Sequence, residues 1–295
     1  MKEIKQSVGV IGLGIMGSAM SANLVKAGFA VHGYDVLPAQ RKSLAAAGGT
    51  PVSAVEELAA PIVITSLPSA LALHQVCGEL KGKPIIVETS TLPIDDKIRA
   101  RDALAAKGIT LLDCPLSGTG AQARTKDLTV FGSGDEAAFH ATRPVLEGFS
   151  RAHYYLGEFG NGSKMKYVAN LLVAIHNVAA AEAFVLGMKA GLDPETIYKV
   201  VADGAGSSRM FQVRGPQMVA GNYEEATMKV EVWQKDMKII GEYATQLGVP
   251  TPLFSASAPL YTAAMAQGFE KKDTAAVCAV LEAMASLRRG AARSP

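Results

Sequence analysis

Cysteine is scarce in this chain, with three residues, Cys77, Cys114 and Cys278, among 295. Three widely separated cysteines are too few for a disulfide framework and lack the close spacing of a zinc site. The five histidines show no metal-ligand spacing either. The sequence therefore predicts no metal and no disulfide, and it fits a reducing compartment.

An excess of charge of one sign is also missing. The formal net charge is +2, and hydrophobic residues make up 49% and charged residues 19% of the chain. A nearly neutral chain gives no case for nucleic acid or an anionic membrane as a partner. This much apolar material can form a sizeable core, which argues against disorder. The one basic cluster, Arg288, Arg289 and Arg293, is expected to be a frayed, solvated terminus.

Long uninterrupted apolar runs are absent as well. The stretch from Val168 to Ala181 comes closest, but Asn170, His176 and Asn177 interrupt it, so we expect no membrane span. The opening residues, MKEIKQSVGVIGLG, contain no long apolar segment before a cleavage site. We therefore expect no signal peptide and a cytoplasmic location.

Short β-rich runs alternate with helical segments over the first half of the chain, and helical patterns alone follow. Continuous apolar strands separated by helices predict a parallel sheet covered on both faces. The predicted fold class is α/β, with a doubly wound domain over 1–162 and an all-α domain over 163–295. The expected strands are 7–12, 30–35, 61–68, 84–89, 110–115 and 128–134. The expected later helices are 164–190, 194–203, 209–219, 230–247, 252–267 and 273–288.

A glycine-rich turn follows the first expected strand and opens a helix over 15–26. The turn matches G-x-G-x-x-G through Gly12, Leu13, Gly14, Ile15, Met16 and Gly17. The first glycine permits a tight turn, the second lets the backbone approach a pyrophosphate, and the third allows close packing of helix on strand. The start of a helix also offers free N–H groups to phosphates. This context predicts a Rossmann-type dinucleotide site.

Asp35 ends the second expected strand, roughly 20 residues past the glycines, as the dinucleotide fingerprint requires. A carboxylate there can accept hydrogen bonds from both ribose hydroxyls and would repel a 2′-phosphate, which favours NAD. Gln40, Arg41 and Lys42 lie close by and could reach such a phosphate. The sequence therefore predicts NAD as the cofactor and leaves NADP open.

Four segments of the chain carry a resemblance to a known family. They read GVIGLGIMGSAMSANLVKAG (9–28), DCPLSGTGAQARTKDLTVFGSG (113–134), GNGSKMKYVAN (160–170) and WQKDMKIIGEYATQLGVPTPL (233–253). Together they resemble the β-hydroxyacid dehydrogenase family, which includes 3-hydroxyisobutyrate dehydrogenase and tartronate semialdehyde reductase. They are similar to the family's nucleotide loop, substrate-binding segment, catalytic segment and later Lys-Asp helix, in that order, and the similarity covers essentially the whole chain.

The resemblance implies that Lys166 is the catalytic residue. Lys166 and Asn170 are four residues apart and so share one face of a helix, with Asn177 on roughly the same side. A polar stripe on an otherwise apolar helix must face water, a partner or a ligand. Burial and a positively charged nicotinamide would lower the pKa of Lys166 toward neutrality. Lys166 would then take the hydroxyl proton while hydride leaves for the nicotinamide, and Asn170 would bind the substrate or hold Lys166.

The resemblance also implies a substrate-binding turn at Ser117, Gly118 and Thr119. Backbone N–H groups and hydroxyls in such a turn can hold a carboxylate. The family usually reads Ser-Gly-Gly here, so Thr119 departs from its pattern. We expect its hydroxyl and methyl to reshape the pocket, which leaves the identity of the acid open.

Further positions follow by analogy with the family. Lys235 is expected to point toward the cofactor, with Asp236 orienting it and contacting the substrate. Leu67 and Pro68 would border the adenosine side of the cofactor, and Thr91 would lie near the nicotinamide. Arg209, which follows a Gly/Ser turn, is a further candidate for pairing with a carboxylate.

Two other interpretations are considered beside the dehydrogenase. One is an inactive relative that uses the fold as a binding platform, and the other is an imine-reducing relative. Relatives of these kinds lose or replace the lysine, so the presence of Lys166 and Asn170 favours an enzyme acting on a small carboxylate. The long apolar helix over 164–190 also predicts a homodimer or homotetramer.

Overall fold

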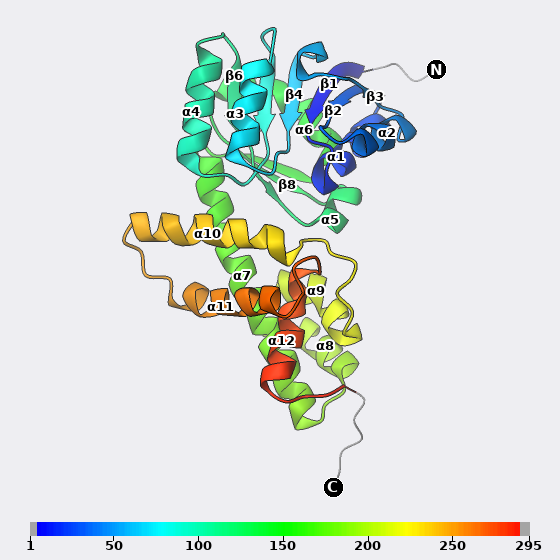
Figure 1. Ribbon diagram of the computed structural model, residues 1–295, viewed down its shortest axis with the longest axis vertical. Helices are drawn as coiled ribbons and strands as arrows, with labels where there is room; N and C mark the ends of the chain where they lie inside the picture. The colour runs from blue at the N-terminus through cyan, green and yellow to red at the C-terminus, as the bar shows by residue number, and fades with distance from the viewer. Residues whose placement is uncertain (1–4, 290–295) are drawn as a thin grey trace. The chain divides into compact units, whose positions relative to one another are not determined.

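The computed structural model describes residues 5–289, and the chain divides into two compact units (Figure 1). Unit 1 comprises Met1–Lys166 and unit 2 comprises Tyr167–Pro295. The division falls inside one long helix, α7 (Asn161–Ala190), so Lys166 is the last residue of unit 1.

A six-stranded parallel sheet forms the centre of unit 1, in the order β3-β2-β1-β4-β5-β6. The chain runs outward from β1 to β3 and then returns to the other side of β1 to add β4. Such a reversal of strand order is where ligands bind in doubly wound folds, outside the carboxyl ends of the strands. The predicted α/β class is confirmed. The strands are β1 (Lys5–Ile11), β2 (Phe29–Tyr34), β3 (Thr50–Pro51), β4 (Ile62–Thr65), β5 (Ile85–Glu88) and β6 (Thr110–Asp113).

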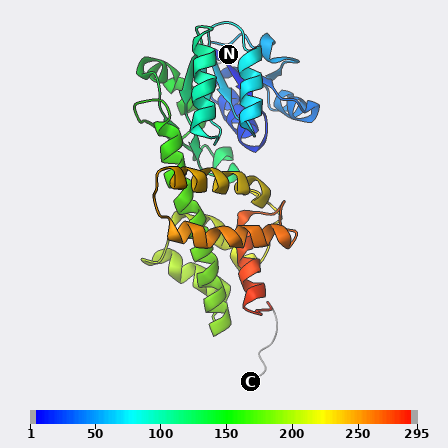
Figure 2. The ribbon, with the colours of Figure 1, turned by 60° about the vertical axis from the view of Figure 1, so that its left-hand side comes forward.

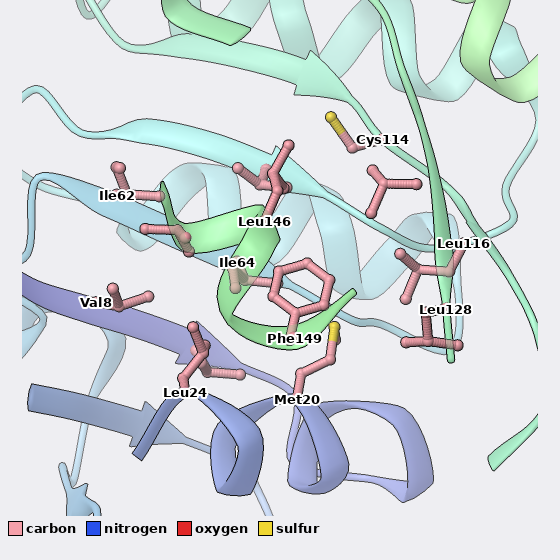
Figure 3. Packing of buried hydrophobic residues seen from close by; sticks show 14 of the residues in the cluster. Val8, Met20, Leu24, Ile62, Ile64, Cys114, Leu116, Leu128, Leu146 and Phe149 are labelled. Atoms are coloured by element: carbon pink, nitrogen blue, oxygen red, sulfur yellow. The ribbon is translucent and has the colours of Figure 1, made fainter. Parts of the chain in front are cut away.

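Helices cover both faces of this sheet because its strands are apolar on both sides. On one face, Leu24 of α1 and Phe149 of α6 pack toward Val8 and Ile64 (Figure 3). On the other face, α3 and α4, the cyan and teal helices side by side in Figure 2, bury Val63. The helices of unit 1 are α1 (Ile15–Lys26), α2 (Pro38–Ala46), α3 (Ala70–Glu79), α4 (Ile94–Ala105), α5 (Gly120–Arg124), α6 (Glu136–Phe149) and the 3-10 turn Val55–Glu57.

A second, three-stranded sheet lies in the same unit, and it corrects the sequence prediction for 128–134. That segment forms β8 (Thr129–Gly132), which pairs antiparallel with β7 (Leu116–Ser117) and parallel with β9 (Ala152–Tyr155). The connection between β7 and β8 is too short for the crossover that a parallel neighbour needs. The prediction that this strand belongs to the main sheet was therefore wrong, and β7 and β9 had not been expected.

Unit 2 is helical, and its core surrounds α7. Ala181 and Phe184 of α7 are buried, and Phe184 stacks on Phe211 with ring centroids 5.2 Å apart. Helix α7 ends at Gly191, whose positive φ of 94° suits glycine. The other helices are α8 (Pro194–Asp203), α9 (Arg209–Ala220), α10 (Val230–Gln246), α11 (Pro252–Ala266), α12 (Val277–Met284) and the 3-10 turn Thr274–Ala276. The last helix is shorter than expected.

The basic cluster at the end of unit 2 is not simply solvated. The Arg289 guanidinium donates to the carbonyl of Val219 at 2.7 Å and that of Met218 at 2.5 Å. It also pairs with Glu282. A cation on the last carbonyls of α9 satisfies groups that a helix end leaves free. The expected frayed terminus is wrong for Arg289, and Arg293 lies outside the described residues.

Helix α7 is long and apolar enough to cross a membrane, judged by length and composition alone. The sequence had led us to expect no such segment, because Asn170, His176 and Asn177 interrupt the run. The core helix of a globular unit meets the same criterion. In unit 2, α7 buries Ala174 and Asn177 against neighbouring helices, and 39% of its most apolar window is buried.

Candidate active site

The glycine turn between β1 and α1 requires glycine at two of its positions. Gly12 has a φ of +87°, its N–H donates to the Tyr34 carbonyl at 2.9 Å, and a Cβ there would lie 2.1 Å from the Ser66 carbonyl oxygen. A Cβ at Gly17 would lie 1.8 Å from the Gly12 carbonyl oxygen. Neither position can hold a side chain without moving the backbone, so both glycines are needed for the tight turn itself.

Gly14 is different, because a Cβ at this position would meet nothing within 4 Å. It is the N-cap of α1, and no side chain accepts a hydrogen bond from the helix start. The first N–H groups of α1 are thus left without a side-chain acceptor beside an open space. This arrangement fits the pyrophosphate of a dinucleotide, which needs donors and room rather than a side chain.

Asp35 holds the turn from the end of β2. Its Oδ2 accepts from the Leu13 N–H at 2.7 Å and its Oδ1 from the Leu37 N–H at 2.8 Å. Each carboxylate oxygen keeps a second lone pair, so ribose hydroxyls can still be accepted. Arg41 also lies here and donates to the Asp35 carbonyl at 2.5 Å. The residues that favour NAD and NADP are therefore neighbours.

The loops after β4 and β5 are joined by one hydrogen bond. The Leu67 N–H donates to the Ser90 hydroxyl at 2.8 Å, while Pro68 is exposed and Thr91 is half-buried. Because β4 and β5 are parallel neighbours, these residues lie at the same carboxyl edge of the sheet.

The turn at Ser117, Gly118 and Thr119 connects β7 to α5. Gly118 has a φ of +132°, and a Cβ there would lie 2.6 Å from Leu128. Thr119 is the N-cap of α5 and forms a capping box with Gln122: its N–H donates to Gln122 Oε1 at 3.0 Å, and its hydroxyl accepts from the Gln122 N–H at 3.5 Å. The threonine that departs from the family pattern thus has a local structural function.

The start of α7 is bound tightly to the two sheets of unit 1. Ser163 donates its N–H to Asp113 Oδ2 and its hydroxyl to Asp113 Oδ1, both at 2.8 Å. The Gly162 N–H donates to the Ser133 hydroxyl at 2.9 Å. Lys166 follows one turn later, and this residue is only 7% exposed.

Beyond Lys166, α7 carries Asn170 into unit 2. The Asn170 amide donates to Asp236 Oδ2 at 2.8 Å, and Lys235 Nζ lies 3.5 Å from Asp236 Oδ1. The structure therefore brings three predicted site residues together. Asn177 does not join them, because its amide donates to the Tyr261 hydroxyl and the Thr274 carbonyl, both at 3.0 Å.

One buried charge cluster was missed by the sequence analysis. Lys97 on α4 is fully buried, and its Nζ lies 2.6 Å from Glu88 Oε2 and 2.8 Å from Asp113 Oδ1. Burial by itself disfavours the charged amine, but the two carboxylates outweigh it and raise the pKa of Lys97 above its usual range. The surrounding sequence, IDDKIRARD (94–102), is that of a solvated helix, so no signal marked this lysine.

The cysteines are not candidates for catalysis. All three are free and buried, and burial raises the pKa of Cys77 to about 11 and that of Cys114 still further. Thiolates are the reactive form, so these thiols are inert at neutral pH. Within residues 5–289, no three His, Cys, Asp or Glu side chains come together as a metal site.

Comparisons with known proteins agree with this geometry. Residues 7–157 match the NAD binding domain of 6-phosphogluconate dehydrogenase, and residues 160–281 match the NAD-binding domain of NADP-dependent 3-hydroxyisobutyrate dehydrogenase. An L-threonate dehydrogenase of Haemophilus influenzae is 33% identical, with 99% of this chain and 100% of that protein covered. A 2-(hydroxymethyl)glutarate dehydrogenase of Eubacterium barkeri is 30% identical, with 96% of each covered.

A solved structure is similar over nearly the same length. The 3-hydroxyisobutyrate dehydrogenase of Salmonella typhimurium superposes with a TM-score of 0.86 at 30% identity, covering 94% of this chain and 100% of that one. With a nucleotide-binding turn, a buried lysine on α7 and relatives of these names over almost its whole length, the chain belongs to the β-hydroxyacid dehydrogenase family and is an NAD(P)-dependent hydroxyacid oxidoreductase.

Proposed function

We propose that this enzyme oxidises a small β-hydroxyacid with Lys166 as the group that accepts the hydroxyl proton. The observation that carries the proposal is the position of Lys166: a buried amine near the start of α7, one turn before Asn170. As a neutral amine, Lys166 takes the hydroxyl proton as hydride leaves the same carbon, and in reverse its ammonium protonates the developing alkoxide. Asn170, held by Asp236, orients the substrate.

The cofactor would be held by the turn from Gly12 to Gly17 and the start of α1. When bound, the nicotinamide accepts the hydride. Asp35 would accept the ribose hydroxyls and so favour NAD over NADP. Leu67 and Pro68 would border the adenosine, with Thr91 and Lys235 nearer the nicotinamide.

The substrate is a small carboxylate. Ser117 and Gly118 would supply donors from a turn that Thr119 shapes, because the Thr119 N–H is already donated to Gln122, and Asn170 and Asp236 would contact the other polar groups of the substrate. The relatives' names supply the acids to test, namely L-threonate, 2-(hydroxymethyl)glutarate and 3-hydroxyisobutyrate. The two domains, 1–162 and 163–295, would serve cofactor binding and substrate binding with oligomerisation, respectively.

The exposed side of α7 supports a homodimer or homotetramer. The three free cysteines fit the reducing cytoplasm as its location. Met165, Val168, Leu172 and Leu186 are all exposed. On a helix with 3.6 residues per turn they gather on one side, about half a turn from Lys166. A second copy of the chain that covers this side would bury these four apolar side chains. It would leave Lys166 in place within unit 1. Light scattering that shows a monomer would contradict this assignment, and partition into membranes would support a span instead.

The test of the main proposal is Lys166→Met assayed on a panel of β-hydroxyacids with NAD and NADP in parallel. Loss of the proton acceptor should lower kcat by about 1,000-fold, within the range of general acid–base contributions. Cofactor affinity should change little, because Lys166 is outside the glycine turn. Lys164→Met is the matched control, since Lys164 lies on the same helix but is exposed and bonds Asn161.

Two outcomes contradict the proposal. One is a Lys166→Met enzyme as fast as the control. The other is a folded wild-type enzyme that binds cofactor but turns over no β-hydroxyacid in the panel.

A further inference from the structure

Lys97 contacts two parts of unit 1. In the proposed function, one part borders the cofactor and the other carries Lys166, the proton acceptor. One carboxylate it contacts, Glu88, ends β5 and leads into the loop that carries Thr91. The other, Asp113, ends β6 and holds the start of α7. All three charged side chains are almost completely inaccessible to solvent.

The Glu88 branch leads to the cofactor loops. Glu88 Oε1 accepts from the Ser90 N–H at 2.9 Å, and the Ser90 hydroxyl accepts from the Leu67 N–H at 2.8 Å. The Lys97 amine occupies the other oxygen of Glu88. The contact with the Lys97 amine therefore fixes the rotamer of Glu88. In that rotamer, Glu88 and Ser90 hold the loops after β4 and β5 together.

The Asp113 branch leads to the helix that carries Lys166. Both oxygens of Asp113 accept from Ser163, and Oδ2 also accepts from the Ser133 hydroxyl at 3.2 Å. A Cβ at Gly162 would lie 2.7 Å from the Asp113 carbonyl oxygen, so this helix start sits directly on the end of β6. A shift of Asp113 would move the first turn of α7.

We propose that Lys97 is a positioning residue of the active site, which fixes the loop after β5 relative to the first turn of α7 by holding Glu88 and Asp113 together. The catalytic consequence rests on the proposed role of Lys166, since that is the group whose placement would change. The hydride leaves a substrate carbon and the proton leaves the hydroxyl on that carbon in the same step. The loop after β5 and the first turn of α7 must therefore keep fixed positions relative to each other.

Electrostatics explain why a cation is required. Without Lys97, two buried carboxylates would face each other, and one would take up a proton that both share. The proton would bridge them at lower pH and be lost at higher pH, where repulsion would separate the two parts. The titratable groups that interact with the cluster include the Cys77 and Cys114 thiols, which burial keeps neutral, and Lys107 contacts Cys77 in turn. The remaining contacts are hydroxyls and N–H groups.

The experiment compares Lys97→Met with Lys97→Met/Glu88→Gln at temperatures well below unfolding. The ratio of variant to wild-type kcat should be near one at about pH 6 and fall about tenfold by about pH 9, as the shared proton is lost. In the double variant, the amide that Glu88→Gln introduces can donate to Asp113. The double variant should therefore restore kcat to within about threefold at both pH values.

Lys107→Met is the matched control, because Lys107 also holds two acceptors in unit 1, the carbonyls of Cys77 and Gly78 at 2.7 and 2.9 Å. Its kcat ratio should not depend on pH. A purely structural lysine would lower the unfolding temperature of Lys97→Met but leave the kcat ratio constant. If Lys97→Met does not fold at the higher pH, the kcat of the double variant at both pH values becomes the deciding measurement. The double variant does not contain two buried carboxylates that repel each other.

Hydrogen exchange separates this proposal from the proposed function, because it needs no turnover. Exchange of residues 161–166 at the higher pH should be faster in Lys97→Met than in wild type or the double variant. Faster exchange in Lys97→Met would support the positioning role of Lys97 even if Lys166→Met were fully active. Wild-type kcat and exchange in folded Lys97→Met at the higher pH, or a folded double variant still tenfold slow at both pH values, overturns the role of Lys97.

Discussion

The starts of α1 and α7 are two solutions to the same physical problem. Both helices begin beside carboxyl ends of strands in unit 1, and both present N–H groups and a partial positive charge there. At α1, Gly14 leaves open space and no side chain accepts from the helix. At α7, Asp113 at the end of β6 and Ser133 just after β8 accept the first N–H groups.

Because of this difference, the two helix starts suit different functions. An open start attracts an anion from outside, so we propose that α1 gives up the stabilisation of a cap in order to bind a phosphate. A start closed by the protein's own carboxylate cannot do so, but it holds the helix in one place. Since Lys166 lies one turn into α7, a fixed start suits that helix, as an open one suits α1.

Asp113→Asn opens the start of α7 and should have the largest effect. The amide NH2 would face either the Lys97 amine or the Ser163 donors, and a buried cation would lose a partner. Breaking a buried pair in this way costs about 3 kcal/mol or more, which urea unfolding would measure. Asp135→Asn is the control, since Asp135 caps α6 at the surface and asparagine caps equally well. Equal stability of the two variants would remove the distinction between the two helix starts.

Gly14→Asp performs the opposite change and closes the start of α1. Gly14 has an extended conformation that any residue can adopt, so the aspartate should cap the helix without strain. Its carboxylate would repel the pyrophosphate, and cofactor affinity should fall about 100-fold with no loss of stability. Fluorescence titration with NADH would measure this. Gly14→Ala, which adds no charge, should lose less. Unchanged affinity in Gly14→Asp would show that phosphate binds elsewhere.

The sequence was sufficient to predict the open helix start but not the closed one. The turn from Gly12 to Gly17 and the helix over 15–26 depend on neighbours within a few residues, and the structure has α1 at those bounds. The contacts of Asp113 with Lys97 and Ser163 span 16 and 50 residues. No local pattern encodes a pairing at such separations. For the same reason Arg289, which caps α9 from 71 residues away, was expected to be solvated.

The predicted site residues also include some whose contacts agree with the sequence and some whose contacts only the structure shows. Asn170 and Asp236 were expected from the resemblance, and the structure joins them by a hydrogen bond. Asn177 has the same spacing pattern as a site residue, yet it is bound to Tyr261 in the core of unit 2. Helical periodicity specifies which side of α7 a residue occupies, but not what covers that side along its length.

Asp35→Asn tests the carboxylate that lies beside the open start without capping it. Its two oxygens hold the N–H groups of Leu13 and Leu37, and an amide can accept only one of these. Removing the charge should shift the ratio of kcat/KM for NAD over NADP by about tenfold toward NADP. Arg41→Gln should shift the ratio the other way. An unchanged ratio in both variants would mean that the end of β2 does not choose the cofactor.

Thr119→Ala addresses a third helix start, that of α5, which is closed by a local cap. The T-x-x-Q pattern of Thr119 and Gln122 is a sequence signature of a capping box. Loss of the hydroxyl should destabilise unit 1 by about 1 kcal/mol, whereas Thr119→Ser, which keeps it, should be as stable as wild type. Urea unfolding of the three proteins would measure this. If alanine proved as stable as serine, the hydroxyl would not be needed as a cap, and the departure from Ser-Gly-Gly would have to act on the substrate.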